Sequence, residues 1–389
     1  DKSAPLALGH RRLSILDLSD AGHQPMVSAC SRYVIAFNGE IYNHLSLREQ
    51  LKNEDGPIAW RGHSDTETLL ACFAAWGVKQ TLQASVGMFA IALWDQQEHI
   101  LTLARDRLGE KPLYWGWCDQ TLLFSSELKA LKVHPAFNTE IDRNALTLLL
   151  RHSYIPAPYS IYLNIQKLIP GHFLQIPLTD DVANSKNATS EAYWSMNEVV
   201  ERGQAKPFTG SPEEAVKLLE SQLSASIADQ MLADVPLGSF LSGGVDSSTI
   251  VALMQLQSSR PVSTFTIGFE EGGYNEAVHA KAVAQHIGTE HNELYVRPKD
   301  ALAVIPHLPR IYCEPFADSS QIPTLLVSQM AKQHVTVALS GDGGDELFGG
   351  YNRYMASRNV WEPVQRLPVF LRHAAAGFLR ALPPATWDN

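Results

Sequence analysis

Short apolar runs separated by polar turns dominate the first half of the chain. Four of these runs have the length and alternation of β-strands, and they lie at residues 33–37, 88–94, 100–104 and 122–124. Strands in series with few helices between them predict layered sheets, not alternating strand–helix units.

Two segments of this half have the helical spacing of apolar residues. One helix is expected to begin near Ser64, with an apolar side formed by Leu69, Leu70, Phe73 and Ala74. The other is expected over 143–152, with an apolar side formed by Leu146, Leu149 and Leu150.

Strands and helices alternate beyond residue 210. A helix opens there with Ser211 as N-cap, Pro212 in the first turn and Glu214 completing a capping box. Strands are predicted at 237–241, 262–269, 293–296 and 335–339, and helices at 246–257, 275–287 and 320–333. This alternation predicts a mostly parallel sheet with helices on both faces.

The stretch between the two halves is polar and includes Asp180, Asp181 and the run 184–187. We therefore predict a linker over 176–210, one domain at 1–175 and a second at 211–389. A chain of 389 residues has the length expected for two domains.

Charge and cysteine content narrow the class of protein. A net charge of −10 argues against a protein that grips nucleic acid, which needs clustered Lys and Arg. No apolar run of about 18 residues occurs, so we predict no membrane span. The four cysteines lack the close spacing of a zinc site and suggest reduced thiols of a cytoplasmic protein; they are Cys30, Cys72, Cys118 and Cys313.

The strongest chemical signal is Ser-Gly-Gly-Val-Asp-Ser-Ser at 242–248, between a predicted strand and a predicted helix. Glycines let backbone N–H groups approach an anion closely, and a helix N-terminus adds partial positive charge. The loop therefore suits a pyrophosphate, although it is not a Walker loop. An ordinary glycine-serine turn explains this ordered set of residues much less well.

A second loop, Ser-Gly-Asp-Gly-Gly-Asp-Glu-Leu-Phe-Gly-Gly-Tyr at 340–351, follows the strand predicted at 335–339. Acids at the carboxyl edge of a parallel sheet, facing a phosphate loop, are suited to holding Mg²⁺. An acidic surface turn is the alternative for this loop alone. Its pairing with the first loop favours the metal site.

Together the two loops resemble the synthetase domain of the asparagine synthase family and of its relative β-lactam synthetase. The resemblance implies an α/β domain of the PP-loop ATP pyrophosphatase type, which is Rossmann-like, with ATP and Mg²⁺ as cofactors and the metal on Asp246 and Asp345. Asp342 stands where one group of the family has a glutamate implicated in proton transfer, and aspartate reaches less far than glutamate. The implied ATP contacts are Leu241, Ser242, Gly243, Gly244, Asp246, Ser247, Ser248, Ile267, Ser340 and Gly341.

Three motifs in the first half, at 9–15, 37–43 and 63–67, resemble a class II glutamine amidotransferase domain. The resemblance implies an α+β Ntn-hydrolase fold, an αββα sandwich that is incomplete here. Glutamine needs a cation for its carboxylate and an anion for its ammonium group, which Arg12 and Asp65 can supply. Asn38 and the N–H of Gly39 can form an oxyanion hole. The implied glutamine pocket comprises Arg12, Leu13, Ser14, Ile15, Asn38, Gly39, Glu40 and Asp65.

The family's nucleophile is a cysteine at the mature N-terminus, assisted by its own α-amine. The sequence starts at Asp1, and none of its four cysteines is a substitute, so we expect the nucleophile to precede Asp1. We likewise expect the acceptor-selecting helices of the family to follow Asn389.

The resemblance implies a ligase in which glutamine supplies ammonia and ATP activates aspartate as β-aspartyl-AMP, giving asparagine, AMP and pyrophosphate. The expected partners are glutamine, aspartate and ATP, without nucleic acid or membrane, and a homodimer stays open. One alternative is an amidotransferase for another carboxylate, such as a sugar acid or a peptide intermediate. Another is a non-catalytic adenine-nucleotide-binding regulator, which the two retained acids disfavour. The net charge disfavours a PP-loop enzyme that acts on tRNA.

Overall fold

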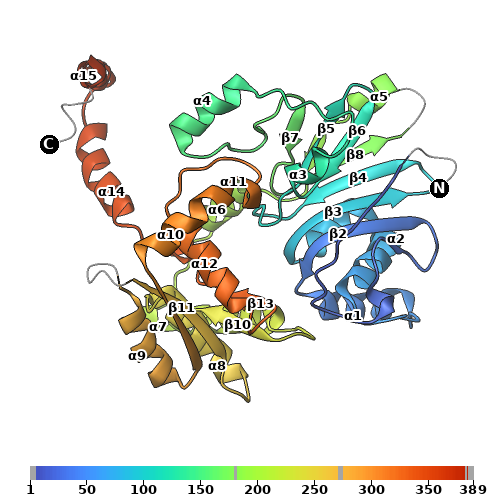
Figure 1. The fold of residues 1–389 in the computed structure, drawn as a ribbon, viewed down its shortest axis with the longest axis horizontal. Helices are drawn as coiled ribbons and strands as arrows, with labels where there is room; N and C mark the ends of the chain where they lie inside the picture. The colour runs from blue at the N-terminus through green and yellow to red at the C-terminus, as the bar shows by residue number, and fades with distance from the viewer. Residues whose placement is uncertain (1–5, 179–181, 270–274, 382, 384–389) are drawn as a thin grey trace.

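The computed structural model describes residues 6–178, 182–269, 275–381 and 383. Two regions differ in the kind of sheet that they contain, and Figure 1 shows them side by side. Antiparallel sheets make up the first region, and a parallel sheet makes up the second. Asp180 and Asp181 of the predicted linker lie outside the described residues.

The main sheet of the first region has the strand order β1-β2-β3-β4-β8-β9, with every neighbouring pair antiparallel. Its strands are β1 (Met26–Val27), β2 (Tyr33–Ile41), β3 (Gly87–Asp95), β4 (Ile100–Arg105), β8 (His172–Pro177) and β9 (Ser190–Ala192). A smaller antiparallel sheet has the order β6-β5-β7. Its strands are β5 (Tyr114–Cys118), β6 (Thr121–Ser125) and β7 (Ile165–Lys167).

Alternation along β3 separates two cores, because successive side chains point to opposite faces of a sheet. Phe89 and Ile91 pack in the core between the main sheet and the helices α1 and α2. Ala90 and Ala92 belong to the core between the two sheets. The other face of the smaller sheet packs on α3 and α4. The resulting layers, helix–sheet–sheet–helix, confirm the predicted αββα sandwich.

The helices of this region are η1 (Asp20–Gly22), α1 (His44–Asp55), α2 (Asp65–Ala84), α3 (Leu128–Leu131) and α4 (Arg143–His152). Ser64 caps α2 by accepting the N–H of Glu67, as the start of the predicted helix required. Three apolar residues that were expected to face the core do not: Ala74 and Leu146 are exposed, and Leu150 is 87% exposed. α2 buries Leu69, Leu70 and Phe73, whereas α4 buries Ala145 and leaves Leu149 half-buried.

The second region contains a four-stranded parallel sheet in the order β12-β11-β10-β13. Its strands are β10 (Leu237–Phe240), β11 (Ser263–Phe269), β12 (Glu290–Val296) and β13 (Val337–Leu339). The chain proceeds outward from β10 to β12 and then returns to the other side of β10. A topological switch point therefore lies between β10 and β13, where ligands of such sheets bind.

Helices cover both faces of this sheet, which confirms the predicted α/β architecture. Phe265 of β11 packs with α12 on one face, while Val251 of α8 and Ala280 of α9 pack around Leu241. The capping box of α7 is present, with Ser211 and Glu214 bonded reciprocally. The helices are α7 (Pro212–Gln230), α8 (Val245–Gln257), α9 (Ala277–Ile287), α10 (Pro298–Val304), η2 (Ile305–His307), α11 (Leu308–Ile311) and α12 (Gln321–Ala331).

The stretch predicted as a linker, 176–210, contains more structure than expected. β8 continues to Pro177 and pairs with β9, so the main sheet reaches Ala192. β9 has three exposed residues at the edge of the sheet, and such a strand has no apolar alternation that a sequence could reveal. The same stretch holds α5 (Val182–Lys186) and α6 (Met196–Ala205).

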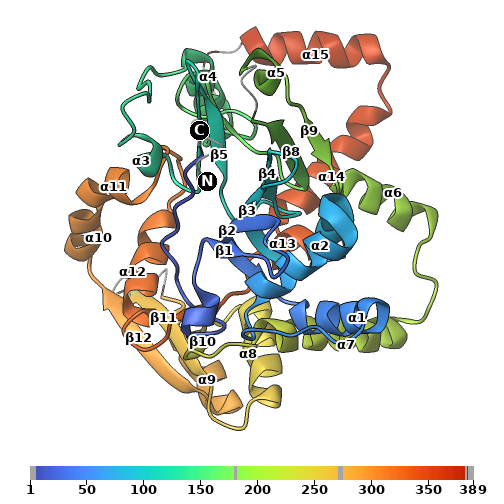
Figure 2. The same ribbon diagram turned by 90° about the vertical axis from the view of Figure 1, so that its right-hand side faces the viewer.

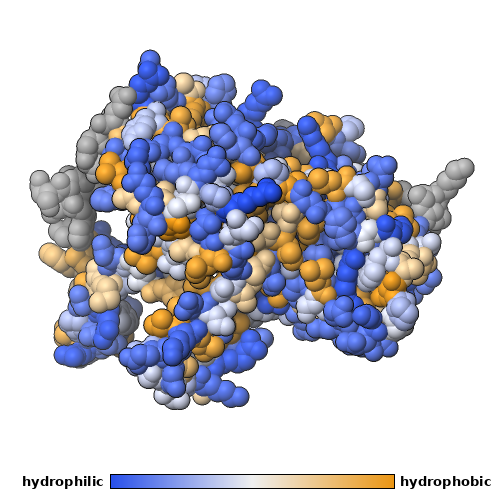
Figure 3. Space-filling view, turned by 90° about the horizontal axis from the view of Figure 1, so that it is seen from below, coloured by the Kyte–Doolittle hydropathy of each residue, from blue (hydrophilic) through white to orange (hydrophobic). Residues whose placement is uncertain are grey.

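Three described helices follow β13, and the last two of them extend away from both sheets, as Figures 1 and 2 show. The three are α13 (Gly344–Phe348), α14 (Asn352–Gln365) and α15 (Val369–Ala381). Trp361, Phe370 and Phe378 on them are exposed. On the face seen from below, apolar and polar side chains are interspersed (Figure 3). No helix in the described part of the chain is long and apolar enough to cross a membrane.

Candidate active sites

A cavity of about 820 Å³ lies in the first region, where the N-terminal loop meets the sheets. Part of its wall is apolar and consists of the small residues Ala36, Ala90 and Ala92. Ser14 of the predicted glutamine pocket is half-buried beside the cavity but does not line it. The other predicted residues do line it: Arg12, Leu13, Ile15, Asn38, Gly39, Glu40 and Asp65.

Arg12 supplies the cation of this cavity. Its Nη1 donates to the carbonyl oxygen of Asp17 at 2.8 Å and its Nη2 to that of Leu16 at 2.5 Å. These two bonds fix the plane of the guanidinium group. A guanidinium has five N–H donors, so three stay available to a carboxylate ligand.

Two buried acids, Asp65 and Glu40, lie in the same cavity. Asp65 accepts the backbone N–H groups of Ile41 at 3.0 Å and Thr66 at 2.7 Å. Burial raises the pKa of Asp65. Burial also raises the pKa of Glu40 to about 7, with the charge of Asp65 as a second cause and Lys111 as an opposing one. The pair therefore suits an ammonium group, which would favour the ionised form of both acids.

Asn38 and Gly39 lie on β2 at the wall of the cavity. Asn38 Nδ2 donates to Ser126 Oγ at 3.0 Å, which holds the amide and leaves its second N–H free to meet an oxyanion. A Cβ on Gly39 would collide with the carbonyl oxygen of Met88 on the neighbouring strand. Glycine is therefore required here by the close approach of two backbones.

Sequence reasoning missed Asp106, which organises the loop on the far side of the cavity. Its fully buried carboxylate accepts the backbone N–H groups of Gly109 at 2.6 Å, Glu110 at 2.9 Å and Lys111 at 2.9 Å. Glu110 and Lys111 line the cavity. The Asp-Arg-Leu-Gly order of 106–109 signals a turn, but not the number of bonds that one carboxylate accepts there.

The loop 242–248 connects β10 to α8 in the second region. Ser242 Oγ lies 2.9 Å from Ser247 Oγ and accepts the N–H of Gly244 at 3.2 Å. Gly243 has φ +82, and a Cβ there would lie 2.7 Å from the backbone nitrogen of Ala280. The loop is thus wound tightly at the start of α8, with Ser242 and Gly244 exposed.

The second glycine-rich loop follows β13 and packs directly on the first. A Cβ on Gly341 would lie 2.8 Å from the backbone nitrogen of Ser247, and one on Gly344 would overlap the carboxylate of Asp246. Ser340 Oγ donates to the carboxylate of Asp342 at 3.0 Å, and Asp342 is exposed. The two loops therefore meet at the switch point between β10 and β13.

The remaining predicted nucleotide contacts lie around this junction. Leu241 is buried, with its N–H bonded to the carbonyl of Phe265. Ile267 is half-buried on β11 beside β10, and the N–H of Ser248 donates to the carbonyl of Gly244 in the first turn of α8. The predicted set thus gathers at one edge of the parallel sheet.

The two predicted metal ligands, Asp246 and Asp345, lie on loops that contact each other, but their carboxylates lie against different residues. Asp246 lies against Gly344, the residue before Asp345, whereas the carboxylate of Asp345 lies against Gly350. Among the described residues, no group of three or more His, Cys, Asp or Glu side chains could hold a metal ion. Two carboxylates are nevertheless a donor set that fits Mg²⁺, which usually takes one or two carboxylates and completes its shell with phosphate oxygens and water.

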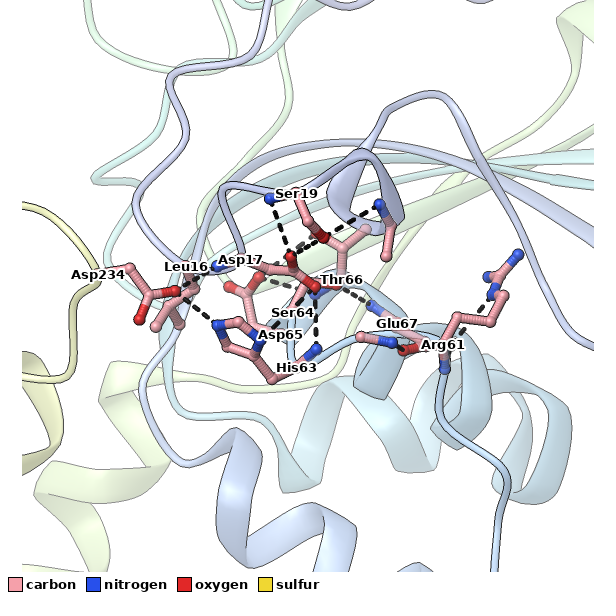
Figure 4. A network of polar contacts seen from close by, with 12 residues as sticks. Leu16, Asp17, Ser19, Arg61, His63, Ser64, Asp65, Thr66, Glu67 and Asp234 are labelled. Atoms are coloured by element: carbon pink, nitrogen blue, oxygen red, sulfur yellow. Dashed lines mark hydrogen bonds and ion pairs between the residues drawn. The ribbon is translucent and has the colours of Figure 1, made fainter.

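The contacts between the two regions include two of buried or half-buried groups and one of exposed groups. Glu314 of the second region accepts the N–H of Ile161 at 2.7 Å and forms an ion pair with Lys167 at 2.5 Å. Cys313 Sγ accepts the N–H of Leu128 at 3.2 Å. A third contact joins Asp234 to His63 at 2.6 Å (Figure 4).

Comparison with known proteins gave two family matches. The model of a glutamine amidotransferase domain matches residues 2–194, and the model of asparagine synthase matches residues 218–387. Each match covers one of the two regions.

Three relatives are each 36% identical to this chain. A Methanocaldococcus jannaschii protein, provisionally named as a glutamine-hydrolysing asparagine synthetase, is matched over 95% of this chain and 72% of its own length. The glutamine-hydrolysing asparagine synthetase 1 of Bacillus subtilis is matched over 95% of this chain and 56% of its length. A Mycobacterium tuberculosis protein, provisionally named in the same way, is matched over 98% and 57%. The chain thus spans between about half and three quarters of these relatives.

Proposed function

The chain belongs to the family of glutamine-hydrolysing asparagine synthetases, and from this premise we propose that it forms an amide in two steps at two sites. Glutamine is hydrolysed in the first region, and ATP-dependent amide synthesis takes place in the second. The observation that carries the proposal is the contact of the loops 242–248 and 340–351 at the switch point of the parallel sheet. The domain division 1–175, 176–210 and 211–389 stays a prediction, with β9 as an argument for a later first boundary.

In the first site, the α-carboxylate of glutamine binds the free donors of Arg12. Its ammonium group lies between Asp65 and Glu40, and Leu13 and Ile15 complete the pocket. The carbonyl oxygen of the side-chain amide points to the amide of Asn38 and the N–H of Gly39. These donors stabilise the negative charge that develops on that oxygen, because they are already oriented before the reaction.

In the second site, the loop 242–248 holds the phosphates of ATP through its N–H groups and serine hydroxyls. Asp246 and Asp345 would hold Mg²⁺, which would supply positive charge to neutralise the pyrophosphate. The acceptor's carboxylate attacks the α-phosphate, and pyrophosphate leaves. Ammonia then attacks the acyl carbon and AMP leaves. Asp342 is the candidate for moving a proton at this stage.

Aspartate is the proposed acceptor, which gives β-aspartyl-AMP and then asparagine. The names of the three relatives support it, and no observation favours another carboxylate. We also propose a cytoplasmic location, because the four cysteines are unpaired thiols. A homodimer stays a prediction.

The test uses the full-length protein with ATP, Mg²⁺, aspartate and glutamine. Asparagine, AMP and pyrophosphate should form in equal amounts, with glutamate from glutamine. Nucleotide cleavage only with a different carboxylate would keep the two-site mechanism and replace aspartate. Glutamine and ATP that both stay intact with every acceptor would overturn the proposal.

A further inference from the structure

Asp234 of the second region lies against the loop that carries Arg12 in the first region (Figure 4). Its Oδ2 accepts the backbone N–H of Asp17 at 2.7 Å. Its own N–H donates to the carbonyl oxygen of Ile15 at 2.9 Å. These two bonds form a reciprocal pair across the contact between the regions. Because both are made to backbone groups, they fix the path of residues 15–17.

Asp17 has a backbone conformation that must be held in place by its surroundings. Asp17 has φ 59, a left-handed conformation that is unfavourable for a non-glycine residue. Such residues persist where their surroundings hold them in place. The side chain of Asp17 is 1% exposed, and its carboxylate accepts from Ser19 Oγ at 2.5 Å and from the N–H of His63 at 2.9 Å. Its backbone N–H is bonded to Asp234, and its carbonyl to Arg12.

The turn formed by residues 15–17 determines where the guanidinium group of Arg12 lies in the glutamine pocket. Both bonds that orient the guanidinium of Arg12 end on the carbonyls of Leu16 and Asp17. A shift of this turn therefore moves both acceptors and rotates the guanidinium with them. Asp234 acts on Arg12 through the backbone and does not touch the cavity itself.

Asp234 also reaches the acidic side of the pocket. His63 Nε2 lies 2.6 Å from Asp234 Oδ2, and His63 directly precedes Ser64, the N-cap of the helix that begins at Asp65. The bond to His63, followed by the Asp17 N–H, holds the pKa of Asp234 below its ordinary value. The side chains of His63 and Asp234 are 60% and 38% exposed, so solvent screens their attraction and the backbone bonds carry more weight.

We propose that Asp234 is a positioning residue for the glutamine pocket, which sets the turn 15–17 and thereby the placement of Arg12. The glutamine site of the first region is then incomplete without a residue of the second. This inference rests on the proposed function and adds to it a residue that lies outside both the glutamine-pocket motifs and the nucleotide-loop motifs.

Three substitutions of Asp234 separate the position of its carboxylate oxygen from the charge of its side chain. In Asp234→Asn, the remaining carbonyl oxygen can accept the bond from Asp17 without a charge. In Asp234→Glu, the charge stays but the added methylene displaces the oxygen. Asp234→Ala removes both. Asp229→Ala is the matched control, because Asp229 is exposed on α7 five residues earlier and lies outside both sites.

The experiment measures kcat and KM for glutamine in the full-length protein, with ammonia-driven amide synthesis as the internal reference. Asp234→Ala and Asp234→Glu should raise the glutamine KM about tenfold, the effect of one lost hydrogen bond to an otherwise buried donor. The kcat for glutamine should change less than KM. Asp234→Asn should stay within about threefold of the unaltered protein, Asp229→Ala should be unchanged, and ammonia-driven synthesis should be kept by all variants.

Three results would overturn the inference. An unchanged glutamine KM in Asp234→Ala would remove the positioning role, and Asp234→Glu decides in the same way if the alanine variant does not fold. Parallel loss of glutamine-driven and ammonia-driven synthesis would show a general structural role instead. An Asp234→Asn variant with a glutamine KM as high as that of Asp234→Ala would show that the charge of the side chain acts, and not the position of its oxygen. Failure of the unaltered protein to hydrolyse glutamine, in contrast, would overturn the proposed function itself and this inference with it.

Discussion

The glutamine pocket and the nucleotide loops present their polar groups in opposite ways. In the pocket, Asp65 and Glu40 are 5% and 7% exposed, and Arg12 already has its orientation. In the nucleotide loops, Ser242 and Asp342 are exposed. The first arrangement suits a small zwitterion that must replace the hydration of buried charges. The second suits a large anion that brings phosphate oxygens and a metal ion with it.

The strands behind each site account for this difference. β2 and β3 pair along nine residues each and form a rigid wall behind Asn38 and Gly39. β10 has four residues and β13 has three, so their motifs lie mostly beyond the sheet. A site can therefore be preformed by long paired strands behind it, or it can be completed by its ligand where those strands are short.

Asp246→Ala should have the largest effect, because it removes one of the two carboxylates proposed to hold the metal. We expect ATP–pyrophosphate exchange to fall about a hundredfold or more, since electrostatic groups of this kind contribute several kcal/mol. Glutamine hydrolysis should change less than about twofold. Glu220→Ala on the exposed face of α7 is the control. If both activities disappeared together, the two sites would not be separate in the way described.

Gly39→Ala tests whether the pocket is rigid. The added Cβ meets the carbonyl of Met88 in a paired strand, so β2 must shift together with the oxyanion donors. We expect glutamine hydrolysis to fall about a hundredfold and the melting temperature to drop, with ATP–pyrophosphate exchange retained. Gly203→Ala, where nothing lies near the added Cβ, should be neutral. A Gly39→Ala variant with normal kinetics would mean that the wall yields easily.

The pH dependence of glutamine binding tests burial as the origin of the pocket's chemistry. Glu40 must be ionised to pair with an ammonium group, and burial raises its pKa to about 7. The glutamine KM should therefore fall as pH rises from about 6 to 8, by at most about tenfold per unit below pH 7. Glu40→Gln should bind more weakly and lose this slope. A KM that stayed flat in the unaltered protein would contradict the pairing.

Ser211→Ala should have the smallest effect and should act on the second region alone. It removes the acceptor for the N–H of Glu214 in the capping box of α7. Loss of such a cap destabilises a protein by about 1 kcal/mol. Denaturant unfolding should detect this decrease, while the glutamine KM stays unchanged. A changed KM would indicate that α7 transmits strain to the pocket through Asp234.

The sequence was informative where local pattern determines structure. Four strands of the first region, the four strands of the parallel sheet and the two glycine-rich loops could be predicted, because their apolar runs and turn residues are contiguous. The strands β1, β5, β7 and β8 were not predicted. β9 could not be predicted, because three exposed edge residues have no such pattern. The roles of Ser126 and Asp106 were not predicted, because they depend on strands that meet only in the fold. The contact of His63 with Asp234 joins residues 171 positions apart, which no local pattern encodes.

The alanines of the cavity wall have a consequence for how such a pocket can change over time. Ala36, Ala90 and Ala92 provide space, whereas the groups that recognise charge come from the loop 9–15, the end of β2 and the start of α2. The size of the admitted molecule and the chemistry of its head group are therefore specified by different residues. A lineage could shrink the chamber by exchanging one of these methyl groups for a larger side chain, while the groups that bind the amino-acid head stay unchanged.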